Sequence, residues 1–356
     1  VDATPLFVVL AGLYFDRTND FATIFELWPS IDAALRWINR HGDRDGDGFV
    51  EYFRAHENGL ANQGWKDSSD SIFHADGALA QGPIALCEVQ GYVYAAKLAA
   101  AKIAAALGHA TRAARIAHEA EELRAHFDEA FWCEDIGTYA IALDGDKRRC
   151  AVRSSNAGQL LFTGIAPRER AVRVGEQLVK KPYFSGWGVR TIAAGEARYN
   201  PMSYHNGSVW PHDNALIGVG MERYGLKQGL QILFSGLFDA ASYMDLRRLP
   251  ELFCGFQRMA GKAPTLYPVA CSPQAWSSCA PFALLQASLG LDFESGAQRV
   301  RLRQPKLPPF LDEVVVRALA VGDARIDLLV RRHGADISVS VLRAKDDGYA
   351  RVEVTL

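Results

Sequence analysis

The feature that most limits how this chain folds is a change of hydrophobic period about three quarters of the way along it. In the first part, apolar residues recur at steps of three and four, which places them on one face of an α-helix. One such run is Ile24, Trp28, Ile31, Leu35 and Ile38. In the last part, apolar and polar residues alternate, which is typical of strands with one buried face. The chain is therefore predicted to be mainly α-helical, with a small C-terminal β region.

The helical period and the Pro and Gly signals at helix ends predict about ten helices. Beyond residue 150 we expect five of them, at 154–162, 168–180, 207–224, 226–244 and 275–290. Four long segments without this period separate the helices, at 41–78, 134–153, 181–206 and 245–274. Long loops in a compact protein are usually functional. Helix pairs with functional loops at one end suggest an α/α toroid.

The strand pattern is confined to the C-terminal part of the chain. Apolar residues alternate within 325–331, 336–341 and 352–356, and Gly-containing turns separate these segments. Such segments predict a small antiparallel sheet. A Pro-rich stretch near residue 305 marks the change of period, so we divide the chain into a helical domain at 1–298 and a β-sheet region at 299–356.

The composition excludes several classes of protein. The 356 residues include 39 Lys+Arg and 41 Asp+Glu, a formal net charge of −2. Nucleic-acid-binding proteins are usually basic, so we expect no nucleic-acid partner. No stretch reaches the about 18 consecutive apolar residues that a membrane helix needs. The six scattered cysteines contain no CxxC pair, and we interpret them as mostly buried thiols of a cytoplasmic protein.

The segment 62–71, NQGWKDSSDS, places Asp67 and Asp70 beside Trp65 in a loop rich in Gly and Ser. A carboxyl group that a Trp ring shields from water has a raised pKa and can serve as a general acid near neutral pH. The alternative is that both aspartates cap turns or a helix, as Asp near Ser commonly does.

A second carboxylate, Glu251, follows a Pro within an apolar and aromatic run at 249–255. Such a Glu is paired, solvated by a bend in the chain, or functional. Two carboxylates on separate loops are what glycoside hydrolysis requires, because one protonates the leaving oxygen while the other activates water or attacks. The chain also contains aromatic residues that suit sugar faces, or an ordinary core: Trp65, Trp187, Trp210 and Trp276.

The segment 203–214, SYHNGSVWPHDN, is rich in planar hydrogen-bonding groups. This composition suits recognition of hydroxyl groups, and the alternative is a polar network that caps the following helix. His205 and His212 have no third soft ligand at a metal spacing, so we do not expect metal catalysis.

The segment 43–51, DRDGDGFVE, resembles a calcium loop, because it offers hard oxygen ligands at alternate positions. The ligands would be Asp43, Asp45, Asp47 and Glu51. It is not an EF-hand, since the twelfth position would be Arg54. The two interpretations are a structural calcium site and a polar turn at the end of a helix.

Seven segments, taken in order, resemble the catalytic region of bacterial amylo-α-1,6-glucosidases, which are glycoside hydrolases of the glycogen-debranching type. They are VDATPLF (1–7), DGDGFVEY (45–52), NQGWKDSSDSIFHADG (62–77), EVQGYVYAAK (88–97), SGWGVRT (185–191), YNPMSYHNGSVWPHDNALI (199–217) and LPELFCGF (249–256). The resemblance covers essentially the whole helical part. It implies an (α/α)6 toroid like that of glucoamylases and trehalases, and hydrolysis of α-glucosidic bonds with inversion and without an organic cofactor.

The resemblance also assigns roles to individual residues. Asp67, in the WKDS motif, would be the general acid, with Asp70 as the fallback, and Glu251, in the LPE motif, would be the general base. For inversion their carboxyl groups should lie roughly 6.5–9.5 Å apart. The substrate is expected to be an oligosaccharide or a glucosyl solute, in a pocket lined by Trp65, Asp70, Glu88, Gln90, Trp187, Arg190, Tyr204, His205, Trp210 and His212.

Members of that family carry a β-rich domain and a first helical hairpin before the VDATPLF motif, and this chain begins at the motif. We therefore expect an incomplete toroid, whose missing hairpin is replaced by a second copy of the chain or by another segment. Three other functions stay open: a carbohydrate-binding remnant without catalysis, an inverting hydrolase of trehalose or a glycosylated small solute, and a toroidal epimerase or cyclase that uses His205 and His212.

Overall fold

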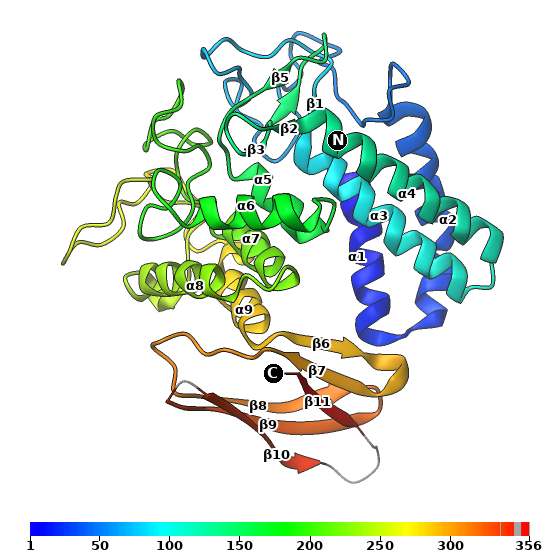
Figure 1. The fold of residues 1–356 in the computed structure, drawn as a ribbon, viewed down its shortest axis with the longest axis vertical. Helices are drawn as coiled ribbons and strands as arrows, with labels where there is room; N and C mark the ends of the chain where they lie inside the picture. Colours follow the sequence, from blue (N-terminus) through cyan, green and yellow to red (C-terminus); the bar gives the residue numbers. More distant parts are fainter. Residues whose placement is uncertain (335, 345–349, 356) are drawn as a thin grey trace.

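The computed structural model describes residues 1–334, 336–344 and 350–355. Within these residues, five α-helices contact one another in chain order (Figure 1). They are α1 (Ala3–Thr18), α3 (Cys87–Ala106), α5 (Asn156–Thr163), α7 (Pro211–Arg223) and α9 (Ala275–Leu289). A second helix packs against each of the first four: α2 (Phe21–Trp37), α4 (Ala110–Phe131), α6 (Arg168–Leu178) and α8 (Lys227–Ser242). Such paired helices, with one row mostly buried, form the arc of a helical toroid.

The five helices expected beyond residue 150 are confirmed to within a few residues. The largest difference is at α7, which begins at Pro211 rather than at 207, because proline suits the first helical position. Gly164 and Gly290 end α5 and α9 in the left-handed conformation that glycine adopts without strain. About ten helices were expected and nine α-helices are present in the described residues, together with a short π-helical segment at Ile38–Gly42.

Small residues allow the buried helices to approach closely. A side chain at Gly220 of α7 would collide with the backbone of Phe162 in α5, only 2.4 Å away. Gly12 of α1 faces Ala99 of α3 in the same way. Helices α1 and α9, the two ends of the row, are not among the described helix pairs that pack closely. The arc is therefore open on one side, and a complete six-hairpin ring is not seen in the described part of the chain.

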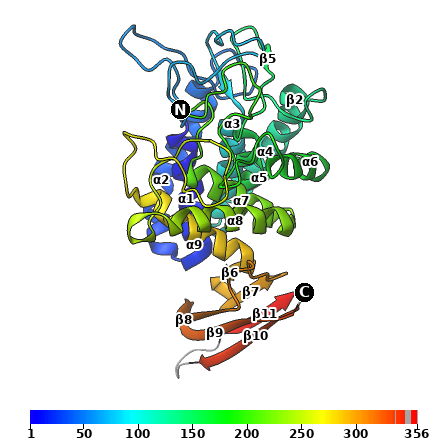
Figure 2. The same ribbon diagram turned by 90° about the vertical axis from the view of Figure 1, so that its left-hand side faces the viewer.

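The loops carry short elements at the end of the helical part that lies opposite the C-terminal sheets (Figures 1 and 2). These are β1 (Ala85–Leu86), β2 (Trp132–Cys133), β3 (Thr138–Tyr139), β4 (Ala142–Leu143) and β5 (Arg149–Cys150). Two 3-10 turns lie at Asp245–Arg247 and Ser295–Ala297. Most of the segment between Asp43 and Ile84 runs without regular structure, as expected for a long loop.

The C-terminal region contains two three-stranded sheets. One is an antiparallel meander of β8 (Glu313–Val321), β9 (Ala324–His333) and β10 (Asp336–Ala344). The other joins β6 (Leu291–Glu294), β7 (Arg299–Arg303) and β11 (Arg351–Thr355), with β11 parallel to β7. The expectation of a single antiparallel sheet is therefore wrong for the last strand. Its alternating pattern showed a half-buried strand but carried no information about its partner.

Apolar residues of both sheets, among them Val300 and Leu328, share one core. Strand β6 starts directly after α9 and pairs with β7, while the division at 298/299 stays a prediction. Leu356, the end of the expected last strand, lies outside the described residues.

Two properties follow from the exposure of the side chains. All six cysteines are free; four are buried, as expected, whereas Cys271 and Cys279 are exposed. Among the described helices, none combines the length and apolar composition that crossing a membrane requires.

Candidate active site

Three loops bring each of the two candidate catalytic carboxylates into contact with one residue of a single dipeptide, Tyr204–His205. The Tyr204 hydroxyl donates a hydrogen bond of 2.9 Å to Glu251 Oε1. His205 Nδ1 lies 3.9 Å from Asp67 Oδ1. Tyr204 and His205 come from the loop before α7, Asp67 from the long loop before β1, and Glu251 from the loop between α8 and α9. The structure therefore gathers three of the predicted segments into one site.

Glu251 is held in place by hydrogen bonds to both carboxylate oxygens. Oε1 accepts from Tyr204, and Oε2 accepts from the backbone N–H of Cys271 at 3.3 Å. The Glu251 N–H in turn donates to the Cys271 carbonyl at 2.9 Å. Burial and the hydrogen bond to Glu251 raise the pKa of Tyr204, so its hydroxyl stays protonated and remains a donor.

Asp67 is far less constrained. Its side chain is 53% exposed, so the shielding by Trp65 that its neighbourhood suggested is not seen. The backbone N–H of Ser68 donates to His205 Nδ1 at 3.3 Å, which leaves the ring proton on Nε2. Burial, with the charge of Lys66 next, lowers the pKa of His205 to about 3. The imidazole beside Asp67 is therefore neutral at physiological pH.

Five rings form a continuous aromatic wall next to these carboxylates. His205 stacks on Trp210 with 5.1 Å between ring centroids, and His212 stacks on Trp276 with 4.0 Å. Trp65 contacts His205, Trp210 and His212 edge-on. Trp276 is 46% exposed, and the hydroxyl of the next residue, Ser277, donates to the Glu251 carbonyl. The aromatic wall thus extends from the loop of Asp67 to that of Glu251.

Three buried charged residues, Lys66, Glu88 and Asp213, form what we term the inner cluster. Each is at most 1% exposed. Lys66 Nζ donates to the Thr191 carbonyl at 2.7 Å, and Asp213 Oδ1 accepts from Gln159 at 2.6 Å. Burial raises the pKa of Glu88 to about 7 and also raises that of Asp213, and it lowers the pKa of Lys66 to about 8.

Polar atoms of the inner cluster and the aromatic wall are buried without a hydrogen-bond partner among the described residues. They are Trp65 Nε1, Glu88 Oε1, His205 Nε2, His212 Nδ1 and Asp213 Oδ2. An unsatisfied buried polar atom costs about 1–3 kcal/mol, so proteins rarely accumulate them without a use. Indole and imidazole donors lie here with carboxylate acceptors. A ligand rich in hydroxyl groups, each both donor and acceptor, would satisfy them.

Three of the predicted pocket residues have their side chains in contacts within the protein. Gln90 bonds both the N–H and the carbonyl of Val50. Arg190 donates to the carbonyls of Pro182 and Gly255. Trp187 is buried and packs edge-on against Tyr243 and under Arg258. Asp70 contributes its backbone carbonyl, which accepts from the Asn206 side chain. These contacts join the loops of the site to one another and to α3.

Lys66 and Asp213 were not predicted as site residues, although both lie in the motifs quoted above. Lys66 separates Trp65 from Asp67 in a segment that looks like a solvated loop. Asp213 lies in the first turn of α7, where an acidic residue is ordinary. The burial of these two charges depends on packing between distant segments, so the local pattern carried no signal of it.

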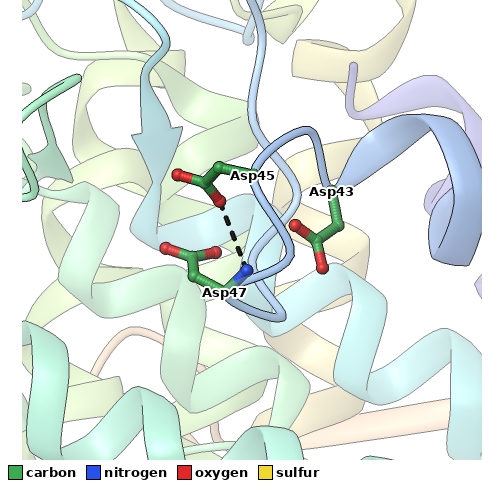
Figure 3. A group of neighbouring side chains, drawn as sticks. All are labelled: Asp43, Asp45 and Asp47. Atoms are coloured by element: carbon green, nitrogen blue, oxygen red, sulfur yellow. Dashed lines mark hydrogen bonds between the residues drawn. The ribbon is translucent and has the colours of Figure 1, made fainter.

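The predicted calcium ligands lie elsewhere, in the acidic loop at residues 43–51. Oxygen atoms of Asp43, Asp45 and Asp47 lie within 4.8 Å of one another (Figure 3). Lys147 Nζ, however, is 2.7 Å from Asp45, 2.6 Å from Asp47 and 3.1 Å from Glu51. The carboxylates suit a hard divalent cation, but an ammonium group binds the same oxygens. As arranged, these residues do not fit a metal ion.

Three solved structures of glycosidases resemble the fold. A sialidase has a TM-score of 0.72 and 12% identity over 94% of this chain and 31% of its own. The GH78 rhamnosidase of Bacillus sp. GL1 has a TM-score of 0.68 and 18% identity, and the match covers 99% of this chain and 32% of the rhamnosidase. The GH63 mannosylglycerate hydrolase of Thermus thermophilus, in complex with glucose, has a TM-score of 0.56 and 18% identity. That match covers 79% of this chain and 74% of the hydrolase. At these identities the likeness concerns the fold alone, and the chain spans about a third of the first two.

A comparison with curated proteins gave no match. The model of the mannosylglycerate hydrolase MGH1-like glycoside hydrolase domain matches residues 3–250, which is more than half of the 356 residues. The match includes Asp67, Tyr204 and His205, and it ends one residue before Glu251. The glycoside hydrolase class expected from the motifs is confirmed, and the debranching subtype is not what this family describes. The chain belongs to the mannosylglycerate hydrolase MGH1-like glycoside hydrolase family of enzymes.

Proposed function

We propose that this chain hydrolyses the glycosidic bond of a glycosylated small solute with inversion, using Asp67 as the general acid and Glu251 as the general base. The observation that carries the proposal is that Glu251 contacts Tyr204 and Asp67 lies next to His205, beside buried polar atoms without partners among the described residues. In an inverting reaction the acid protonates the leaving oxygen while the base activates water on the opposite face of the sugar.

The contacts of the two carboxylates favour this division of roles. The base must present one oriented oxygen to a water molecule, and Glu251 is fixed by donors from Tyr204 and Cys271. The acid must recover its proton from solvent after each turnover, and Asp67 is 53% exposed. Because His205 is neutral, it adds no positive charge beside Asp67 that would favour loss of that proton.

The choice of a small solute rests on the family model, whose name is that of a mannosylglycerate hydrolase. A structural neighbour also bears that name. The ordered debranching-type motifs favour a second candidate, hydrolysis of α-1,6-glucosidic branches. Trehalose is a third substrate of similar size to the first. The three candidate substrates differ in the size and charge of the leaving group. A panel of substrates therefore distinguishes between them.

The test is sugar release from mannosylglycerate, glucosylglycerate, trehalose, isomaltose, panose, maltooligosaccharides and glycogen limit dextrin, with the anomer followed by NMR. We expect release from a small glycosyl solute, with early product of the inverted configuration. Asp67→Asn and Glu251→Gln should each lower kcat at least about 10²–10⁴-fold while substrate still binds.

Asp70→Asn is the matched control, because it removes the other carboxylate of the same loop. Loss of turnover in Asp70→Asn, with Asp67→Asn active, would transfer the acid role to Asp70. A folded protein that binds sugars and releases none from the panel would contradict the proposal and favour a binding remnant.

A further inference from the structure

The acidic loop is folded so that some of its carboxylate oxygens bond the backbone and others face a common point. Asp43 accepts from the N–H groups of Gly46 at 2.7 Å and Gly48 at 2.9 Å. Asp45 Oδ1 accepts from the Asp47 N–H at 3.3 Å (Figure 3). Both glycines have positive φ, at 81° and 88°, which this tight turn requires. The Oδ2 atoms of Asp45 and Asp47 remain available for a cation.

That cation comes from a turn about a hundred residues away. Lys147 lies between β4 and β5, in a turn closed by its own N–H, which donates to the Asp144 carbonyl at 2.9 Å. Asp144 Oδ1 also accepts from the N–H groups of Asp146 and Arg148. The turn is therefore well fixed, and it directs the Lys147 ammonium between the loop carboxylates. An ammonium has three donors, and three carboxylates lie within 3.1 Å of it.

Glu51 supplies the third carboxylate, and it has one oxygen that Lys147 does not use. Its side chain is completely buried, and Oε2 lies 3.1 Å from Lys147 Nζ. Oε1 is buried without any partner among the described residues. A buried carboxylate with an unused oxygen is costly, and a divalent ion, which takes six to eight oxygen ligands, would use it.

We propose that Lys147 is the resident cation of a calcium-type loop, and that removing its ammonium group uncovers a binding site for Ca²⁺. The ammonium nitrogen lies 2.6–3.1 Å from three carboxylates, whereas Ca²⁺ binds oxygen at about 2.3–2.6 Å. Small shifts of the side chains would therefore form the metal site. Lys147 and Ca²⁺ cannot occupy it together, because both need the same oxygens.

The acidic loop is also connected by hydrogen bonds to the segment that carries the candidate acid, Asp67. Val50, next to Glu51, is bonded through both its N–H and its carbonyl to Gln90 of α3. The Tyr52 hydroxyl donates to Asn62 at 2.7 Å, and Asn62 begins the segment that carries Asp67. The proposal concerns a site apart from the catalytic carboxylates and does not depend on the reaction they perform.

The experiment titrates Ca²⁺ into the full chain by calorimetry and records thermal melting in EDTA and in excess Ca²⁺. The parent protein should show no binding and the same melting temperature in both. Lys147→Met should bind one Ca²⁺ with an affinity at least tenfold above the detection limit at which the parent shows no binding. It should melt a few degrees lower than the parent in EDTA but not in Ca²⁺. Adding Asp45→Asn to this variant should abolish the binding. Lys102→Met, which removes the exposed ion pair with Asp16, should behave as the parent.

Two results would overturn the proposal. One is binding of a single Ca²⁺ by the parent that Asp45→Asn abolishes, because the metal would then be the natural cation. The other is a Lys147→Met protein without Ca²⁺ affinity. Lys147→Gln, which keeps a hydrogen-bond donor, is the second variant, and failure of both variants to fold in the presence of Ca²⁺ also contradicts the proposal.

Discussion

The inner cluster and the acidic loop with its partner Lys147 both combine carboxylates with one lysine, but their charges are paired differently. At the acidic loop, Lys147 from the turn between β4 and β5 is 32% exposed and lies within ion-pair distance of three carboxylates. In the inner cluster, Lys66 is buried, yet its hydrogen bond goes to a backbone carbonyl, and both carboxylates keep an oxygen without a partner in the described residues. The acidic loop satisfies most of its charges internally, whereas the inner cluster leaves part of its hydrogen-bonding capacity for a ligand.

The difference predicts how each cluster responds to removal of its lysine, and Lys66→Met should have the largest effect. Without the ammonium, Glu88 and Asp213 are buried charges without compensation, which costs about 3–5 kcal/mol. Lys147→Met should cost about 1 kcal/mol, because two of its three carboxylates, Asp45 and Asp47, are partly solvated. Urea denaturation measures both, at a pH between the pKa of Glu88 (about 7) and that of Lys66 (about 8). Equal losses would show that the two clusters do not differ as we describe.

The loss in Lys66→Met should also depend on pH. The positive charge of Lys66 lowers the pKa of Glu88, so its removal raises that pKa further. A carboxyl group whose pKa is raised on folding stabilises the protein less as pH rises from its ordinary value of 4.5 through its folded value. The part of the deficit that comes from Glu88 should therefore grow as pH rises above about 7, where Glu88 ionises in the parent protein. It should vanish below that pH, because Glu88 is then protonated in both folded proteins.

A second prediction concerns the free energy of unfolding at acid pH, which the two buried histidines of the aromatic wall should lower. Burial lowers the pKa of both His205 and His212 from 6.5 to about 3. Only the unfolded chain takes up these protons, so stability falls as pH drops from 6.5 toward 3, by about 2–3 kcal/mol per histidine at about pH 4.5. His212→Gln should reduce this loss in denaturation curves recorded at neutral pH and at about pH 4.5. His118→Gln, at an exposed position on α4, is the control and should leave it unchanged.

The smallest expected effect is that of salt on the stability differences between the parent protein and the two lysine variants. At about 1 M ionic strength exposed charges are screened over about 3 Å, whereas buried charges are screened much less. The stability difference between the parent and Lys147→Met should fall by about 0.5 kcal/mol in about 1 M NaCl. The difference for Lys66→Met should stay the same. A salt-sensitive Lys66→Met would indicate that water and ions reach the inner cluster.

The parts of the molecule that depend on local pattern were predictable. Helices α5 to α9 follow from apolar periodicity and from Pro and Gly at their ends, and the structure confirms their positions. The roles of Asp67 and Glu251 came from ordered motifs. The fold brings both residues into contact with one dipeptide, Tyr204–His205.

Features that depend on distant partners were not predictable. Spacing within 43–51 identified the carboxylates, but Lys147, which binds them, lies about a hundred residues away. The burial of Lys66 and the parallel pairing of β11 with β7 likewise require the three-dimensional arrangement. Local pattern shows what a segment can form, and packing decides which segment it meets.

The contact between Glu251 and Cys271 has a consequence for how this enzyme tolerates mutation. The donor to Glu251 Oε2 is a main-chain amide, and the return bond ends on a main-chain carbonyl. Any residue except proline supplies that amide, so position 271 can vary widely while the support of the carboxylate is inherited unchanged. A substitution at position 271 should therefore leave the support of the Glu251 carboxylate intact as long as the path of the backbone is kept.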